Sequence, residues 1–232
     1  MGNAAAKQLE ETALAVGAVK PDDKKAIAKT MVSDDTMKIK SKGKTWVSYG
    51  DGADDKRVIW TYKHVGTFKK HTLVEDAQGV HVATILTAKK GMASCSNVLC
   101  KDTPSYEGQT PLTEEELKAA GVKEHATALY PFAKYDTKRT MTTAKCTYGL
   151  VTGQDAVTAL YEGEKLSSMG FKAIFREAAG GTAVAKAHMP GMTMTPHLEA
   201  AGGVDLLAVV SMGYALAGDE SSAGALAGAG VV

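Results

Sequence analysis

The chain has 232 residues, 44% of them hydrophobic and 23% charged, and a formal net charge of +1. This length can bury a sizeable core, and the composition is that of a globular protein. A charge this close to zero argues against nucleic-acid binding through bulk electrostatics. Three cysteines predict reduced thiols in a cytosolic setting, and the first fifteen residues lack the apolar region of a secretory signal peptide.

Residues 1–35 are expected to form an N-terminal helical extension. Small and apolar residues recur at helical spacing as far as Val16, and Gly17 can end that helix. Pro21 suits the first turn of a second short helix. This part of the chain therefore predicts two helices and no strand.

From Thr36 onward, alternation of apolar and polar residues between turns predicts strands. Gly79 and Gly181 lie at equivalent places in two predicted hairpins that share a weak internal repeat, and each suits a turn that needs positive φ. The stretches with strand character are "TMKIKSKGKTWVSYGDG", "RVIWTYKHVG", "FKKHTLVEDAQGVHVATILTA", "SCSNVLC", "HATALYPFAKYD", "RTMTTAKCTYGLV", "TALYEG" and "MGFKAIFREAAGGTAVAKAHM".

Two further helices are predicted among or after these strands. Residues 104–125 form a helical insertion, in which Thr113 and Glu116 make a capping box and Gly121 is the stop. Residues 204–217 form an apolar run of 14 residues, shorter than the roughly 20 that span a bilayer. Its apolar side chains point in every direction around the helix, which predicts a helix enclosed by protein. A lipid-inserted hairpin or tail anchor is the alternative, and residues 221–232 are expected to be a flexible tail.

Many short strands and one wholly apolar helix pose a packing problem, because a single open sheet covers only one side of a helix. A closed antiparallel barrel covers every side and leaves no sheet edge. The strand order, the hairpin "VEDAQGVHVATI", the stretch "LYEGEKLSSMGFKAIFREAAGGTAVAK" and the late helix "GVDLLAVVSMGYALAGD" resemble the tubby C-terminal-like superfamily. The nearest branch is the LURP-one-related proteins, and phospholipid scramblases are more distant. Over residues 36–220 the resemblance implies a mostly β fold, a twelve-stranded barrel around a central C-terminal helix. The resemblance also implies phosphoinositide binding, but it does not indicate which residues form the site.

No motif in the sequence predicts an enzyme, a cofactor or a metal site. Cys95 and Cys100 are spaced so that a strand places them on opposite faces, and Cys146 lies far away in sequence. The histidines form no zinc-ligand pair, and no Gly-x-Ser-x-Gly elbow is present. We therefore expect buried, inert thiols and a non-enzymatic protein.

The first residues resemble an acylated N-terminus. "MGNAAAK" supplies Gly2 behind a removable Met1, followed by small residues and Lys7, as in the myristoylated start of the cyclic-AMP-dependent protein kinase catalytic subunit. Ala6 departs from the usual Ser or Thr, and an incidental Met-Gly start is the alternative. One myristoyl chain binds membrane only weakly, so a second membrane signal is expected.

That second signal is predicted in "KIKSKGK". Lys38, Lys40, Lys42 and Lys44 alternate, so a regular strand would carry all four on one face. The row can contact anionic lipid headgroups, and Lys63, Lys69 and Lys70 could extend it. The alternative is an edge strand that lysines protect from aggregation.

The leading functional prediction is a myristoyl-tethered, cytoplasmic, peripheral membrane protein that binds anionic lipid or phosphoinositide. A structural or adaptor barrel that binds a protein partner is the second, with the N-terminal helices as docking elements. A scramblase-like membrane protein is the third. No nucleic-acid partner is expected.

Overall fold

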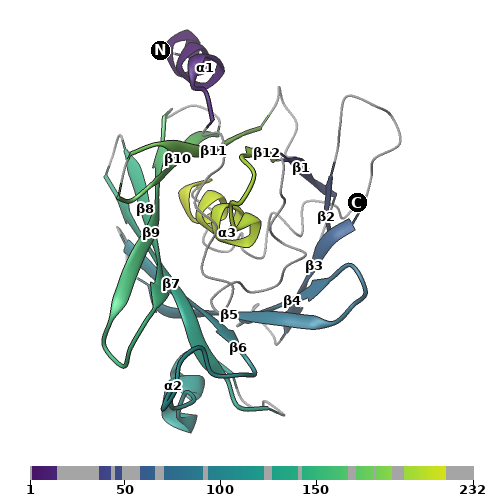
Figure 1. Cartoon of the computed structure of the whole chain (residues 1–232), viewed down its shortest axis with the longest axis vertical. Helices are drawn as coiled ribbons and strands as arrows, with labels where there is room; N and C mark the ends of the chain where they lie inside the picture. The colour runs from purple at the N-terminus through teal and green to yellow at the C-terminus, as the bar shows by residue number, and fades with distance from the viewer. Residues whose placement is uncertain are drawn as a thin grey trace.

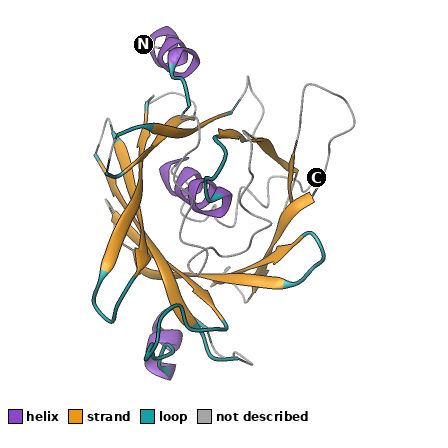
Figure 2. Cartoon of the chain, viewed as in Figure 1, coloured by secondary structure: helices purple, strands orange, loops and turns teal. Residues whose placement is uncertain are grey.

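The computed structural model describes residues 2–14, 37–42, 45–48, 58–65, 71–90, 94–122, 127–140, 143–166, 171–179, 181–189 and 196–217. These residues form mostly β-structure with three helices (Figure 2), which confirms the mostly β, antiparallel fold class. The second predicted N-terminal helix and the tail at 221–232 lie outside the described residues.

Twelve antiparallel strands are present within the described part of the chain. They are β1 (Met37–Lys42), β2 (Thr45–Ser48), β3 (Val58–Val65), β4 (His71–Asp76), β5 (His81–Lys90), β6 (Ser94–Lys101), β7 (Tyr130–Arg139), β8 (Ala144–Val151), β9 (Val157–Lys165), β10 (Lys172–Glu177), β11 (Ala183–His188) and β12 (His197–Ala200). From β2 to β12 each strand pairs with the next in sequence, and β1 pairs with both β2 and β12. The pairing order therefore returns to its start, as in a barrel (Figure 1).

The two hairpins with the weak repeat form as predicted. β4 pairs with β5 and β10 pairs with β11. Gly79 and Gly181 have φ of 81° and 64°, a region that glycine enters without steric cost. Strand β12 was not predicted, because its four residues contain no β-branched or aromatic side chain and no local pattern marks them.

Helix α3 (Leu206–Ala217) lies inside the ring of strands (Figure 1). Its residues up to Tyr214 are all buried, and Ala215 and Ala217 are partly exposed. The helix packs on β7, β8, β9 and β10, and on the other side the ring of Tyr214 meets that of Tyr62 from β3, with centroids 5.9 Å apart. The predicted enclosure of the apolar run by strands from both halves of the chain is thus confirmed.

Both ends of α3 have polar side chains as partners, at the buried start of the helix and at its partly exposed end. Asp205, 3% exposed, precedes the helix, and its Oδ1 accepts a hydrogen bond of 3.1 Å from the N–H of Ala208. This is N-capping, which satisfies one of the unpaired N–H groups of the first turn. At the other end Nη2 of Arg139, the last residue of β7, donates to the carbonyl of Ala215. A cation there also complements the negative end of the helix dipole.

Strand β9 and helix α3 approach each other closely at Gly163. A Cβ on Gly163 of β9 would lie 2.9 Å from the Phe175 ring and 3.0 Å from Leu216 Cδ1. Glycine is therefore required for α3 and β10 to pack this closely on β9.

Helix α1 (Gly2–Glu11) lies outside the ring of strands and packs on β10 (Figure 1). Its buried residues Ala5 and Leu9 are four apart, and Leu9 joins Ile174 and Ala183 in a small apolar cluster. The predicted helix as far as Val16 is wrong in its end point, because residues 12–14 are not helical. Thr12 Oγ1 instead donates to the carbonyl of Gln8 and closes the last turn.

The insertion carries helix α2 (Glu114–Ala119), with the predicted capping box between Thr113 and Glu116 and a positive φ of 77° at Gly121. It covers the outside of β5 and β6. Its apolar side chains form a second cluster with residues of those strands and of the stretch before β7, composed of Leu86, Val98, Cys100, Leu112, Leu117, Ala120, Val122 and Leu129.

Candidate functional site

Basic side chains collect on the outer surface of β10, β11, β12 and β1, four neighbouring strands in Figure 1. Ala173, Ala187 and Leu198 of these strands belong to the buried core, so the residues that alternate with them point outward. Six of these outward side chains are together called the basic face: Lys38, Lys172, Lys186, His188, His197 and Glu199. Its three lysines face a single carboxylate.

The register arranges these residues in two rows across the strands. In the first row Lys186 is opposite Glu199, and Glu199 is opposite Lys38. Lys186 Nζ lies 3.4 Å from Glu199 Oε2, and both side chains are largely buried. The single carboxylate of the face is therefore already engaged by a lysine.

In the second row Lys172 is opposite His188, which is opposite His197. The two imidazole rings have centroids 5.6 Å apart and are tilted by 48°. The backbone register continues to Lys40 of β1 as the partner of His197. Burial lowers the pKa of His188, Lys172 and Lys186 lower it further, and Glu199 opposes them. This part of the face thus repels added positive charge.

Helix α1 lies beside this face. Ile174, which packs against Leu9 of α1, is the register partner of Lys186. The helix that begins at Gly2 and the lysine and histidine rows therefore occupy neighbouring strands on one outer surface.

The predicted lysine row is described only in part. Lys38 is half-buried opposite Glu199, Lys40 is the register partner of His197, and Lys42 is that of Thr45. Lys44, Lys69 and Lys70 lie outside the described residues. Lys63, on β3, pairs with Glu75 at 2.7 Å, so a carboxylate offsets its charge.

The edge-strand alternative for this row does not fit the pairing. β1 is hydrogen-bonded to β2 on one side and to β12 on the other. A strand paired on both sides has no free backbone row for lysines to protect.

A second outer surface, across β7 to β10, is larger but balanced in charge. It forms a hollow of about 560 Å³ lined by three carboxylates, three cations and a few neutral residues: Asp136, Glu162, Glu164, Lys138, Lys145, Arg176, Cys146, Thr147, Gly163 and Ile174. Lys145 and Glu164 are 4.0 Å apart. Because the charges offset one another, this hollow has no preference for anions.

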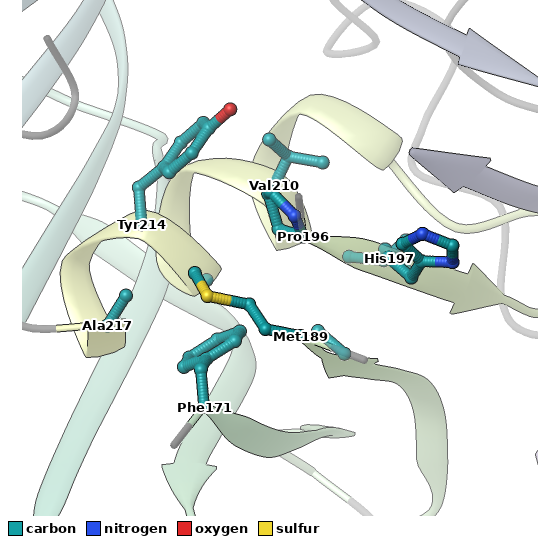
Figure 3. Close-up of a pocket in the computed structure, with 10 residues that line it drawn as sticks. Phe171, Met189, Pro196, His197, Val210, Tyr214 and Ala217 are labelled. Carbon is teal, nitrogen blue, oxygen red and sulfur yellow. The ribbon is translucent and has the colours of Figure 1, made fainter. Parts of the chain in front are cut away.

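A cavity beside α3 is too small for a lipid. It lies between α3 and strands β11 and β12, and the residues that line it include Phe171, Met189 and Tyr214 (Figure 3). Its volume is about 10 Å³, which is room for about one water molecule. This cavity itself has no room for a ligand of organic size.

The three cysteines are buried. Cys95 and Cys100 lie on opposite faces of β6 as predicted: Cys100 joins the cluster under α2, whereas Cys95 lies near Tyr135 on the inner side. Burial raises the pKa of Cys100 and of Cys146 to about 12, so both are protonated and unreactive at neutral pH. Among the described residues, no group of three or more His, Cys, Asp or Glu is arranged to hold a metal ion.

Sequence reasoning missed Lys172, Lys186, His188 and His197 as site candidates. They are spread over three strands, and only the pairing of β11 with the unpredicted β12 brings the histidines together. The one usable signal was local: Lys186 and His188 alternate along β11 as the lysines do along β1.

No protein-family model and no curated protein matches this sequence. Among solved structures, the X-ray structure of a protein from Arabidopsis thaliana aligns over 80% of this chain and 92% of that one, with 13% identity and a TM-score of 0.47. Within the described residues, every helix falls short of the length and apolar character needed to cross a membrane.

Proposed function

We propose that this chain is a non-enzymatic tubby-like barrel of the LURP-one-related type, closed around its C-terminal helix. An acyl chain on Gly2 tethers it to the cytoplasmic leaflet, and the basic face binds anionic lipid. The observation that carries the proposal is the common position of α1 and the basic face, joined through the pairing of Ile174 with Lys186. The fold part is supported by the sequence resemblance, by the antiparallel strand order and by the burial of α3.

The energetics of two weak signals favour this arrangement. A single myristoyl chain gives only marginal membrane affinity, and a lysine near an anionic surface adds about 1 kcal/mol. The three lysines of the basic face, whose one glutamate is already paired, can supply the membrane-binding free energy that the acyl chain lacks. This requires that the acyl chain and the basic face reach the same membrane surface. This electrostatic part of the affinity should fall as salt is added. At physiological ionic strength, screening already limits the range of the attraction between charges to about 8 Å.

The test is co-sedimentation of acylated protein with vesicles of graded phosphatidylglycerol content at low and high salt. One variant carries glutamine at the four predicted lysines, Lys38, Lys40, Lys42 and Lys44, and a second at Lys38, Lys172 and Lys186. The matched control carries glutamine at three exposed lysines elsewhere, Lys118, Lys138 and Lys145, and a further control at Lys7, Lys24 and Lys25. We expect the first two variants to bind less and the controls to bind as the unchanged protein does. Vesicle binding that is independent of the lipid charge and is the same for all four glutamine variants would contradict the proposal.

An adaptor that binds a protein partner is the second candidate. The observation that favours it is a groove of about 570 Å³ between the insertion and the outer side of β5 to β8, with apolar walls that include Leu86, Val98 and Pro131. Two results together would favour the adaptor hypothesis over the lipid-binding hypothesis. The protein would fail to bind vesicles, and deletion of the insertion would abolish its association with a protein partner in cells.

A further inference from the structure

The histidine pair of the basic face is unusual, because two imidazoles stand side by side among cations. Their centroids are 5.6 Å apart, and Lys172 and Lys186 flank His188 on two sides. Glu199 is the one carboxylate facing the pair from the described side chains of β10, β11, β12 and β1, and Lys186 already engages it. An anion that binds beside these two imidazoles would favour their protonated forms.

We propose that His188, His197 and Lys172 form a binding site for a phosphate group and that occupation of this site is coupled to protonation of the two histidines. The inference deepens the proposed function and rests on it for the source of the phosphate, a lipid headgroup. The phosphate group binds without any covalent reaction.

The geometry fits a phosphate group. A phosphate group that bridges the edges of two rings at this separation can accept a hydrogen bond of about 2.9 Å from each ring at different oxygens. The phosphodiester of a lipid headgroup offers two unesterified oxygens that share one negative charge, and each of them can accept more than one hydrogen bond. The site offers donors from two imidazoles and one ammonium.

The coupling to protons follows from the charges. Without an anion, burial and the neighbouring lysines hold the pKa of His188 below its ordinary value, so it is neutral at neutral pH. A bound phosphate reverses the sign of the local field and favours imidazolium. By linkage, an anion that raises the affinity for protons is itself bound more tightly when protons are abundant.

The experiment uses acylated full-length protein and phosphatidylglycerol vesicles, whose phosphodiester charge does not titrate in the range where histidine does. From about pH 8 to about pH 5 we expect binding to strengthen about fivefold for each imidazole that gains a proton. The double variant His188→Gln, His197→Gln should keep the binding seen at high pH and lose the increase. The control His81→Gln removes an imidazole from β5, where it bonds to Thr84, and should keep the increase.

A second measurement separates this site from the lipid proposal. NMR titration of the histidine side chains is compared in inorganic phosphate and in chloride of equal ionic strength. We expect phosphate to raise the pKa of both His188 and His197 and to leave that of His81 unchanged. Unchanged titration of both, or a double variant with the full pH response on vesicles, overturns the inference while lipid binding stands. Failure of the protein to bind vesicles at any pH overturns the proposed function, and the phosphate titration then decides the site alone.

Discussion

The backbone N–H of Asp205 donates a hydrogen bond to the hydroxyl of Tyr161, 3.3 Å away, and this ties the first turn of α3 to strand β9. The Asp205 carboxylate caps the same turn, so one residue fixes the helix start twice. It does so in the core, where an ionised group is costly. The position of α3 and the acid–base behaviour of the fold are therefore linked through one side chain.

Stability should depend on the ionisation of Asp205. Burial raises its pKa to about 6, partly offset by the N–H groups of Ala208 and Leu207, from the 3.8 of an unperturbed carboxyl. Since the folded state holds the proton more tightly, this stabilisation is complete below about pH 4 and is lost as the pH rises towards 6. A shift of about two units corresponds to about 3 kcal/mol.

Asp205→Asn keeps a capping oxygen and removes the charge. We expect this variant to match the unchanged protein near pH 4 and to be more stable by up to about 3 kcal/mol above pH 6. Urea unfolding across this pH range measures the difference, and Asp155→Asn, in an exposed turn, is the control. An equal pH response in the unchanged protein and in Asp205→Asn would show that the pKa of Asp205 is the same in the folded and unfolded states, which would contradict the raised pKa.

A charge in the middle of α3 should prevent folding. Leu207 is fully buried and Val210 is 2% exposed, so aspartate at either place would bury a carboxylate with no prepared partner. The cost of such a change, about 4 kcal/mol or more, is comparable with the whole stability of many domains. We expect loss of the thermal transition in circular dichroism, whereas Leu207→Met should cost less than about 1.5 kcal/mol. Aspartate variants that melt at the unchanged temperature would be incompatible with an enclosed helix.

Gly163→Ala tests the close approach of β9 to α3. The added methyl would meet the Phe175 ring and Leu216 at about 3 Å, closer than carbon atoms pack, so one of them must move. We expect a loss of about 1–3 kcal/mol in the free energy of unfolding. The control Gly153→Ala, in the turn before β9, meets its nearest atom at 3.3 Å and should cost less. Equal effects of the two changes would argue against tight packing at Gly163.

The acyl tether makes a separate prediction. Gly2→Ala removes the only acceptor for an N-terminal acyl chain and leaves the buried positions Ala5 and Leu9 of α1 unchanged. We expect fractionation of eukaryotic cells to find the variant in the soluble fraction and the unchanged protein with membranes, since the basic face alone binds weakly. Intact mass spectrometry is the direct check, and an unmodified N-terminus in the unchanged protein would end the tether hypothesis.

Local signals predicted most of the fold. The capping box of Thr113 and Glu116, the turn glycines at 79 and 181 and the apolar run that became α3 are each encoded within a few residues of sequence. The misses lie where local signals are absent or misleading. The four residues of β12 carry no strand pattern, whereas the residues after Glu11 keep helical spacing although α1 ends there.

The site was less predictable than the fold because it depends on register between distant strands. The neighbours of Lys38 and Lys40 are Glu199 and His197, and a slip of one residue would bring Leu198 opposite instead. Nothing near residue 38 encodes that alignment. Leu198 and Ala200 of β12 are buried, and only the assembled structure determines which residues of β1 lie opposite them.

The pairing of β1 with β12 also bears on how this protein acquires its structure during synthesis. Met37 pairs with Ala200, and the helix that fills the core follows β12, so most of the chain has to leave the ribosome before either contact can form. Contacts of such high sequence separation slow folding, and until they form the sheet has two unpaired edges beside an unfilled apolar interior. A nascent chain in this condition is prone to aggregate and is the kind of substrate that chaperones protect. Truncation just before β12 should therefore yield aggregates rather than a smaller folded domain.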